Sequence, residues 1–169
     1  MFNLIVTLIA IGLGVVITAT TVFYGGDSYS EGTTEAIATT YINQAQQVQG
    51  GFTLYKAKFG ASAVSVQELK TEGYLSSIPK TPAGQSWALA SNGTDDFIGV
   101  VSEVATSSDA GISPEVCEKI NENGGDLVIC GSVTATATTF DDTVAATFTQ
   151  GAIAYDAETV SYAAVVMGR

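Results

Sequence analysis

The stretch LIVTLIAIGLGVVITATTVFY, residues 4–24, contains no charged side chain and begins three residues after Met1. At a rise of about 1.5 Å per residue, a helix of this length extends roughly 31 Å, which matches the hydrocarbon thickness of a bilayer. The segment is therefore long enough to span a membrane.

The charges around this segment indicate its orientation and processing. Acids follow it at Asp27, Glu31 and Glu35, whereas the first basic residue of the chain is Lys56. A secretory signal has a basic region before its apolar run, so we expect that a basic leader has been removed ahead of Met1. The flanking acids favour an exported C-terminal part, with the amino terminus on the cytoplasmic side.

The apolar segment also contains small and β-branched residues. Gly12 and Gly14 lie in its first half, and threonine occurs at Thr7, Thr18, Thr20 and Thr21. Glycine and threonine allow helices to approach closely in lipid, whereas glycine and β-branched residues lower helix propensity in water. The segment either packs against other helices or is an ordinary single-pass anchor.

The composition limits the possible functions. The chain has 17 acids, 6 bases and no histidine, which gives a net charge of −11. Such a surface repels nucleic-acid phosphates and anionic lipid headgroups, so no nucleic-acid partner is expected. A charged fraction of 14% is low and is typical of secreted and surface proteins.

The only cysteines are Cys117 and Cys130. In an exported domain, an isolated pair at this spacing predicts one disulfide. A zinc site is the weaker alternative, because the chain has no CxxC motif and no histidine to complete the ligand set.

Beyond the apolar segment, a helical face continues to residue 59. Apolar residues recur at intervals of three and four, the period of one helix face: Ile37, Tyr41, Ala45, Val48, Phe52, Tyr55 and Phe59. We expect one long helix, interrupted or bent at Gly25–Gly26 and Gly50–Gly51, with a possible cap at Ser30. The predicted organisation is an apolar helix over 1–25, an amphipathic second half over 26–59 and a globular region over 60–169.

The globular region has signals for short helices and strands. Helices are expected over 66–72, stopped by Gly73, and from Ser113 through Ile120. Strand-like alternation begins near Trp87, and β-branched runs fill the last third: LVICGSVTATATTF, TVAATFTQGAIAYDA and ETVSYAAVVMGR. The fold class is therefore α+β, with a long N-terminal helix packed on a region that contains an antiparallel sheet.

The sequence lacks the constellations of an enzyme. It contains no histidine, no GxSxG, no P-loop and no dinucleotide-binding fingerprint, so we expect no catalytic site, no metal and no cofactor. The acid pairs Asp95–Asp96 and Asp141–Asp142 are either solvated turns or parts of a calcium site. Asn92 lies in an NGT sequon and is a possible glycosylation site. The aromatic residues are explained by core packing more simply than by charge transport.

Two motifs in this layout resemble the type IV pilins and the pseudopilins of type II secretion. Residues 67–87 contain QEL…GYL…IP…TPAG…W, which is similar to the loop after the long helix in that family. Residues 113–130, SPEVCEKINENGGDLVIC, resemble the cysteine-bounded segment of type IVb pilins. The resemblance covers the whole chain in layout and about 40 positions in identity.

The resemblance implies a subunit that is anchored in the inner membrane as a precursor and is processed and methylated at Met1 by prepilin peptidase. The pilus machinery would then build it into an extracellular helical homopolymer. Such filaments serve adhesion, twitching motility, DNA uptake or phage reception, and the sequence does not choose among these roles. The membrane and filament-core positions would be Leu4, Ile5, Leu8, Ile11, Gly12, Gly14, Val15, Thr18 and Val22. One position departs from the family: Ile5 stands where its members usually have glutamate.

Three functions remain open. The first is a structural filament subunit. The second is a minor pilin or pseudopilin, which the missing glutamate favours. The third is a membrane-anchored extracytoplasmic binding domain that does not polymerise.

Overall fold

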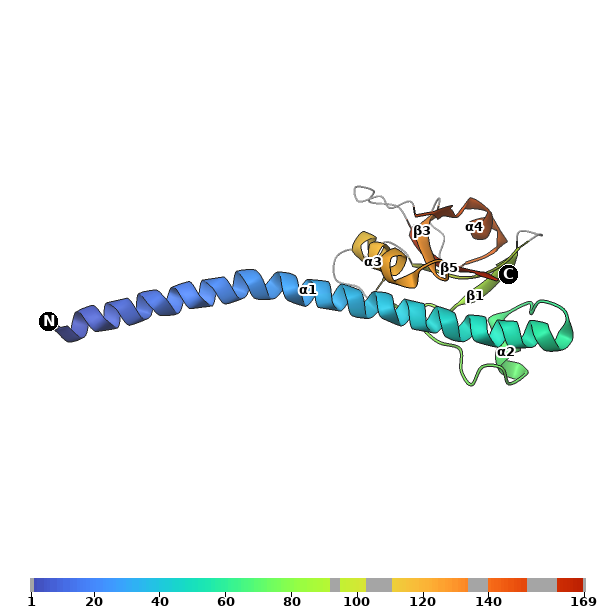
Figure 1. The fold of residues 1–169 in the computed structure, drawn as a ribbon, viewed down its shortest axis with the longest axis horizontal. Coiled ribbons are helices and arrows are strands. Elements are labelled where there is room, and N and C mark those ends of the chain that lie inside the picture. Colours follow the sequence, from blue (N-terminus) through green and yellow to red (C-terminus); the bar gives the residue numbers. More distant parts are fainter. Residues whose placement is uncertain (1, 92–94, 103–110, 134–139, 152–160, 169) are drawn as a thin grey trace. The chain divides into compact units, whose positions relative to one another are not determined.

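The computed structural model describes residues 2–91, 95–102, 111–133, 140–151 and 161–168 (Figure 1). The chain divides into two compact units, Met1–Thr34, here called the stem, and Glu35–Arg169, here called the head. The elements in chain order are α1 (Phe2–Phe59), α2 (Val66–Thr71), β1 (Ala88–Ser91), β2 (Asp96–Ser102), α3 (Pro114–Gly124), β3 (Ile129–Val133), α4 (Asp142–Thr147), β4 (Thr149–Gln150) and β5 (Ser161–Gly168).

Helix α1 confirms the predicted long helix, but without the predicted interruptions. It runs from Phe2 to Phe59 as one α-helix, so Ser30 lies inside it and is not a cap. Glycine lowers helix stability by only about 1 kcal/mol per residue, and an established helix propagates at little further cost. The glycine pairs therefore weaken the helix locally without ending it.

In the head, α1 contributes one face to the main hydrophobic core. Tyr41, Ala45 and Val48 are fully buried, and Phe52 and Tyr55 are nearly so, as the spacing predicted. The two ends of the predicted stripe differ, because Ile37 is only partly buried and the side chain of Phe59 is 48% exposed at the helix end. Sequence spacing identified the face but not where its contacts stop.

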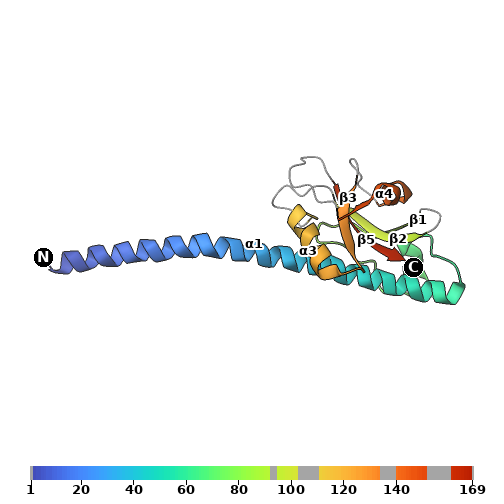
Figure 2. The ribbon, with the colours of Figure 1, turned by 45° about the horizontal axis from the view of Figure 1, so that its top comes forward.

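The predicted antiparallel sheet is present. Its strand order is β1-β2-β5-β3-β4, and every neighbouring pair is antiparallel (Figure 2). The last strand of the chain, β5, lies between β2 and β3 and pairs with both along most of its length. Strand β5 is therefore the central strand and joins β1 and β2 to β3 and β4.

Both faces of the sheet are covered. Ala164 and Val166 of β5 face the core that contains α1 and α3, whereas Ala163 and Val165 belong to a second core with Phe140 and residues of α4. This is the two-residue alternation of a strand. Gly99 of β2 allows the second core to form, because a Cβ there would lie 2.6 Å from the ring of Phe140.

One strand prediction is wrong. The run TVAATFTQGAIAYDA covers residues 143–157. Its first five residues belong to α4 (Asp142–Thr147), and of its described residues only Thr149–Gln150 form a strand. The carboxylate of Asp141 accepts a hydrogen bond from the backbone N–H of Val144 at 2.9 Å and caps the helix. This cap, with the burial of Val144 on the sheet, overrides the strand preference of the β-branched residues. The rest of that run, residues 152–157, lies outside the described residues.

Helix α3 is fixed to β3 by covalent and polar contacts. Ser113 caps it, Pro114 occupies its first position, and Gly125 follows its end with a φ of 57°. Cys117 of α3 and Cys130 of β3 form a disulfide with a Cα–Cα distance of 5.3 Å. The side-chain amide of Asn121 also binds both the N–H and the C=O of Cys130, at 2.8 and 3.1 Å.

Candidate functional site

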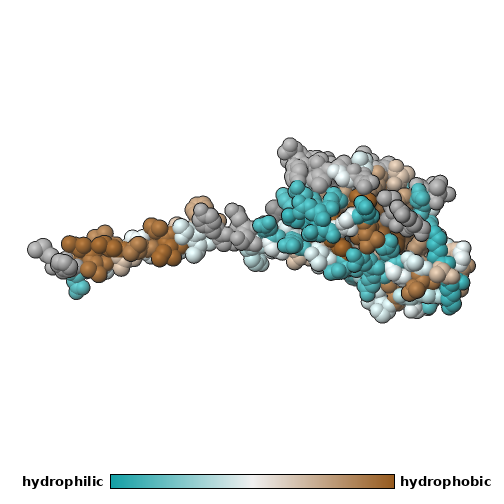
Figure 3. All heavy atoms as spheres, viewed as in Figure 1, coloured by the Kyte–Doolittle hydropathy of each residue, from teal (hydrophilic) through white to brown (hydrophobic). Residues whose placement is uncertain are grey.

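The stem contains the most unusual surface of the described chain. Residues Asn3–Phe23 form an apolar helical segment of 21 residues with a mean hydropathy of 2.4, none of which is buried. Figure 3 shows hydrophobic side chains along it. Large apolar side chains cost free energy in water in proportion to their exposed area, so this surface requires lipid or a protein partner. Its length and composition suit a membrane anchor or a signal sequence.

The structure places every predicted core position of this segment on the open surface. Leu4, Leu8 and Ile11 are 63–69% exposed, and Ile5, Val15 and Val22 are likewise exposed large apolar side chains. Gly12 and Gly14 have open space where a Cβ would stand. Because successive helix residues are about 100° apart, these two glycines lie on opposite faces of α1.

The threonine hydroxyls of the segment bond within their own helix. Thr7 donates to the carbonyl of Asn3 at 2.5 Å, Thr18 to that of Gly14 at 2.7 Å, and Thr21 to that of Thr18 at 2.9 Å. The hydroxyl of Thr20 also bonds to carbonyls of the preceding turn. With its donors satisfied internally, the segment is compatible with hydrocarbon. Threonine donors are therefore not free for bonds between helices, and close packing must supply the contact.

One face of the segment is hollowed. A shallow groove follows the helix at intervals of three and four residues, with Gly14 and Ala19 as its smallest members; it is lined by Ile11, Gly14, Val15, Thr18, Ala19, Val22 and Phe23. Small residues between larger ones allow a second backbone to approach closely in a dry environment. This face is shaped to receive another helix.

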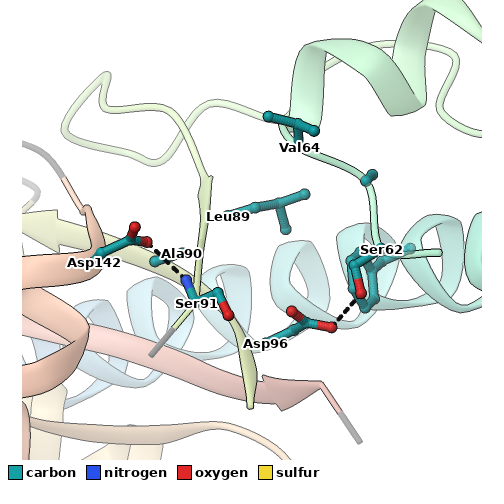
Figure 4. Close-up of a pocket in the computed structure, with 9 residues that line it drawn as sticks. Ser62, Val64, Leu89, Ala90, Ser91, Asp96 and Asp142 are labelled. Carbon is teal, nitrogen blue, oxygen red and sulfur yellow. Dashed lines mark hydrogen bonds between the residues drawn. The ribbon is translucent and has the colours of Figure 1, made fainter. Parts of the chain in front are cut away.

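The head contains a pocket beside the edge strand β1 (Figure 4). Its walls are Phe52 of α1, the loop 62–64, strand β1 and two carboxylates, Asp96 and Asp142. Asp96 accepts a hydrogen bond from Ser62 and pairs with Lys56 at 3.3 Å. Asp142 accepts the backbone N–H of Ser91 at 2.8 Å. Both carboxylates therefore join segments of the head, and nothing here assigns the pocket a reactive group.

The described chain does not support the calcium-site alternative for the two acid pairs. Asp141 and Asp142 bind different groups, the N-terminus of α4 and strand β1, so their carboxylates serve separate contacts. Asp96 is held by Lys56 and Ser62. Among the described residues, no group of three or more possible metal ligands comes together.

A polar and aromatic contact ties α2 to the end of α1. Tyr55 donates to the Glu68 carboxylate at 2.7 Å, and the backbone N–H of Val64 donates to its second oxygen at 2.8 Å. Both bonds lower the pKa of Glu68, and the bond from the Tyr55 hydroxyl has the larger effect. The same hydrogen bond, with smaller contributions from burial and neighbouring acids, raises the pKa of Tyr55 to about 12. The rings of Phe59 and Tyr74 complete the cluster.

Gln44 is a positioning residue that the sequence pattern did not identify. Its side chain donates to the carbonyl of Lys80 at 2.8 Å and accepts from the indole N–H of Trp87 at 3.0 Å. These contacts hold the loop after α2 against α1. Nearby, burial raises the pKa of Tyr41, an effect that the hydroxyls of Thr81 and Ser102 oppose.

Two predicted sites cannot be placed. Met1, the expected site of processing and methylation, and Asn92, the possible glycosylation site, both lie outside the described residues. The cysteine pair, in contrast, is bonded and lies in the head.

Searches against protein-family models, curated proteins and solved structures find no match to this chain.

Proposed function

We propose that this protein is a structural subunit of an extracellular filament of the type IV pilus kind. The observation that supports the proposal most is that one helix, α1, carries a fully exposed apolar segment at Asn3–Phe23 and a deeply buried face from Ala38 to Tyr55. The buried face is part of the core of the head. The exposed segment has no role in that core and is suited to lipid first and to copies of itself afterwards.

Assembly exchanges lipid contacts for contacts between identical helices. No water is displaced from apolar surface in this step, so close packing must supply the stabilisation. The groove around Gly14 provides the shape for such packing, and the internally bonded threonines leave no unsatisfied donor on it. A heterologous contact of this kind does not close on itself and propagates as a helix.

The absence of an acid from the apolar segment favours a second candidate within the same class. Ile5 stands where the resembled family usually has glutamate, and no acid precedes Asp27. A minor or tip subunit would not need the pairing that the glutamate makes in a filament. The number of copies per filament, measured on purified appendages, separates a major subunit from a minor one.

The test of the proposed function is a bulky substitution in the groove. Gly14→Leu fills the smallest position of the groove and should abolish filaments seen by electron microscopy, while the amount of membrane-bound protein stays the same. Gly32→Leu is the matched control, because Gly32 is also an open position on α1 but lies outside the apolar segment. Filaments of normal length and number from Gly14→Leu would contradict the proposal.

The alternative of a membrane-anchored domain that never polymerises gives a different result. Cells would then release no filamentous material on shearing, and the detergent-solubilised full chain would sediment as a monomer under every condition. That outcome would mean that the protein is a domain held by a single membrane helix and not a filament subunit.

A further inference from the structure

We propose that Asn123, at the end of α3, is a site of spontaneous chemical modification, in which attack by the backbone nitrogen of Gly124 removes its side-chain amide. The residue becomes aspartate or isoaspartate, and the chain gains one negative charge. This inference goes beyond the proposed function and does not rest on it, because it concerns the chemistry of the head alone.

The reaction needs an asparagine that is followed by a residue without a bulky side chain. The backbone nitrogen of Gly124 loses its proton and attacks the Cγ atom of Asn123. The new C–N bond closes a succinimide ring, and the side-chain nitrogen leaves as ammonia. Water then opens the ring at either carbonyl, which gives aspartate or isoaspartate. Glycine favours ring closure because it has no Cβ to hinder it.

The structure explains why glycine follows Asn123. Asn-Gly occurs twice in the chain, at 92–93 and at 123–124, and the first pair lies outside the described residues. In the second pair the side chain of Asn123 is exposed, whereas Gly124 is buried. A Cβ on Gly124 would lie 3.3 Å from the Cβ of Val128. Packing of the head therefore favours glycine at the position that makes Asn123 reactive.

The folded helix restrains the reaction. Helix α3 ends at Gly124, so the N–H of Gly124 donates to a carbonyl of the preceding turn. The attack also requires the backbone of Asn123 to leave its helical dihedral angles. The last turn must therefore open before the amide is lost, and the rate of modification depends on the free energy of this local opening.

The last turn of α3 is suited to local opening. Gly124 and Gly125 end the helix, and glycine is the weakest helix former apart from proline. The carbonyl of Gly124 accepts the N–H groups of Leu127 and Val128 at 3.3 and 3.4 Å, longer than the usual range of about 2.7–3.2 Å. The exposed side chain of Asn123 contributes no core contact that would oppose opening.

Asn121 opposes the opening of the same turn. Its side-chain amide bonds to the N–H and the C=O of Cys130 at 2.8 and 3.1 Å, and Cys130 is itself bonded to Cys117 of α3. Asn121 is followed by Glu122 and not by glycine, so it is not itself a favoured site of the reaction. The rate at Asn123 should therefore report how firmly Asn121 holds the end of α3.

The modification should weaken the contact that Gly124 makes. An acid at position 123 would lie in the last turn of α3, where the helix dipole disfavours an anion, in a chain whose net charge is already −11. Isoaspartate also carries the main chain through its side-chain carbon, which the regular geometry of an α-helix does not accommodate. The packing of Gly124 beside Val128 and Ile42 would then be loosened.

The experiment incubates the full folded chain in mild detergent, in neutral and in alkaline buffer. Mass spectrometry of its peptides then assigns aspartate and isoaspartate to individual asparagines. The same chain, reduced and unfolded in urea, gives the unrestrained rate. Asn121→Ser removes the two bonds to Cys130 with little change in helix propensity. Asn123→Gln is the control, because glutamine closes the corresponding larger ring far more slowly.

Asn123 should convert in the folded chain more slowly than in urea and faster in alkaline than in neutral buffer, while Asn121 stays intact. Asn121→Ser should raise the rate about ten-fold, because two hydrogen bonds no longer oppose the opening, and Asn123→Gln should show no conversion at that position. If thermal unfolding shows that Asn121→Ser does not fold, hydrogen exchange of the wild type is the second measurement, and the N–H of Gly124 should exchange faster than that of Ile120.

Three results would overturn the proposal. The first is a folded wild type without aspartate or isoaspartate at position 123 after the unfolded chain has converted completely. The second is an equal rate in the folded and unfolded chains, which would mean that α3 does not restrain the reaction. The third is an unchanged rate in a folded Asn121→Ser variant or, where that variant does not fold, slower exchange at Gly124 than at Ile120.

Discussion

Two neighbouring glycines of α1 provide the sharpest test of how the head is packed. Gly51 is buried beneath the loop after α2, where a Cβ would lie 3.1 Å from the Cγ and Cδ2 atoms of Leu75 and 3.4 Å from the carbonyl oxygen of Tyr74. Gly50 is exposed, and a Cβ there would meet nothing within 4 Å. Alanine at position 50 should therefore stabilise the head, and alanine at position 51 should lose that gain or destabilise it.

The magnitudes follow from helix propensity and overpacking. Alanine is better than glycine in a helix interior by about 1 kcal/mol, so Gly50→Ala should raise the free energy of unfolding by about that amount. Gly51→Ala has the same gain, but overpacking a buried contact costs typically about 1–3 kcal/mol. The Cγ atom of Leu75 is not a flexible chain end, so the contact cannot be relieved by a simple rotation. We expect the two variants to differ by about 1–3 kcal/mol.

The assay is urea unfolding of the full chain in mild detergent. Trp87 is the only tryptophan and is 3% exposed, so its fluorescence reports the packing of the head. If Gly51→Ala is stabilised as much as Gly50→Ala, the close contact between α1 and the loop after α2 is wrong.

Three further predictions concern the same head. Tyr55→Phe should destabilise the head, because Glu68 loses a hydrogen bond. Tyr41→Phe should leave the stability unchanged or raise it, because the structure shows no partner in good geometry for the buried Tyr41 hydroxyl among the described residues. Equal losses of stability in urea unfolding would argue against this difference between the two tyrosines. Because the pKa of Glu68 is lowered in the folded state, its contribution to the free energy of unfolding is present above the pKa of the unfolded chain, about 4.3, and disappears as the pH falls below it. The pKa of Tyr55, raised to about 12, means that its contribution is complete below pH about 10 and is lost as the pH rises toward 12. Tyr55→Phe should flatten the alkaline limb of a plot of stability against pH, and an unchanged limb would exclude Tyr55 as its source. Replacing both Cys117 and Cys130 by alanine opens a link across a sequence separation of 13 and should cost about 3 kcal/mol; a change below about 1 kcal/mol would mean that Asn121 alone fixes α3 to β3.

The features that the sequence predicted well depend on local periodicity. The spacing from Tyr41 to Tyr55 identified the buried face of α1, because three- and four-residue intervals on a helix leave few alternatives. The β-branched run around Val165 predicted a strand, and its alternation places Ala164 and Val166 in one core and Val165 in the other. The cysteine pair was predictable because the chain has no other cysteine.

The features that could not be predicted depend on contacts between distant segments. Asp141 and Asp142 look like one acid pair, yet one caps α4 and the other binds strand β1. The role of Gln44 depends on Lys80 and Trp87, about forty positions further along the chain. No local sequence pattern identifies the roles of these residues, because the hydrogen-bond partners of their side chains are distant in the sequence and come close only in the folded chain.

The candidate surface in the stem was predictable in extent but not in detail. The apolar run identified residues 4–24, and the structure gives Asn3–Phe23. The sequence did not show that Thr7, Thr18 and Thr21 use their hydroxyls within the helix. A threonine hydroxyl can bond within its own helix or to a neighbouring one. The carbonyls three and four residues earlier become available to it only once the helix has formed.

The central claim, that the stem packs against identical copies, is tested most directly by cross-linking a single introduced thiol. The native cysteines are both in the disulfide, so Val15→Cys, in the groove of the stem, would be the only free thiol. Material sheared from cells and treated with a short bismaleimide should give covalent dimers of the full chain, and the same protein dispersed in excess detergent should give monomers. Monomers alone from the sheared material, with Val15→Cys still open to a water-soluble thiol reagent, would contradict the claim.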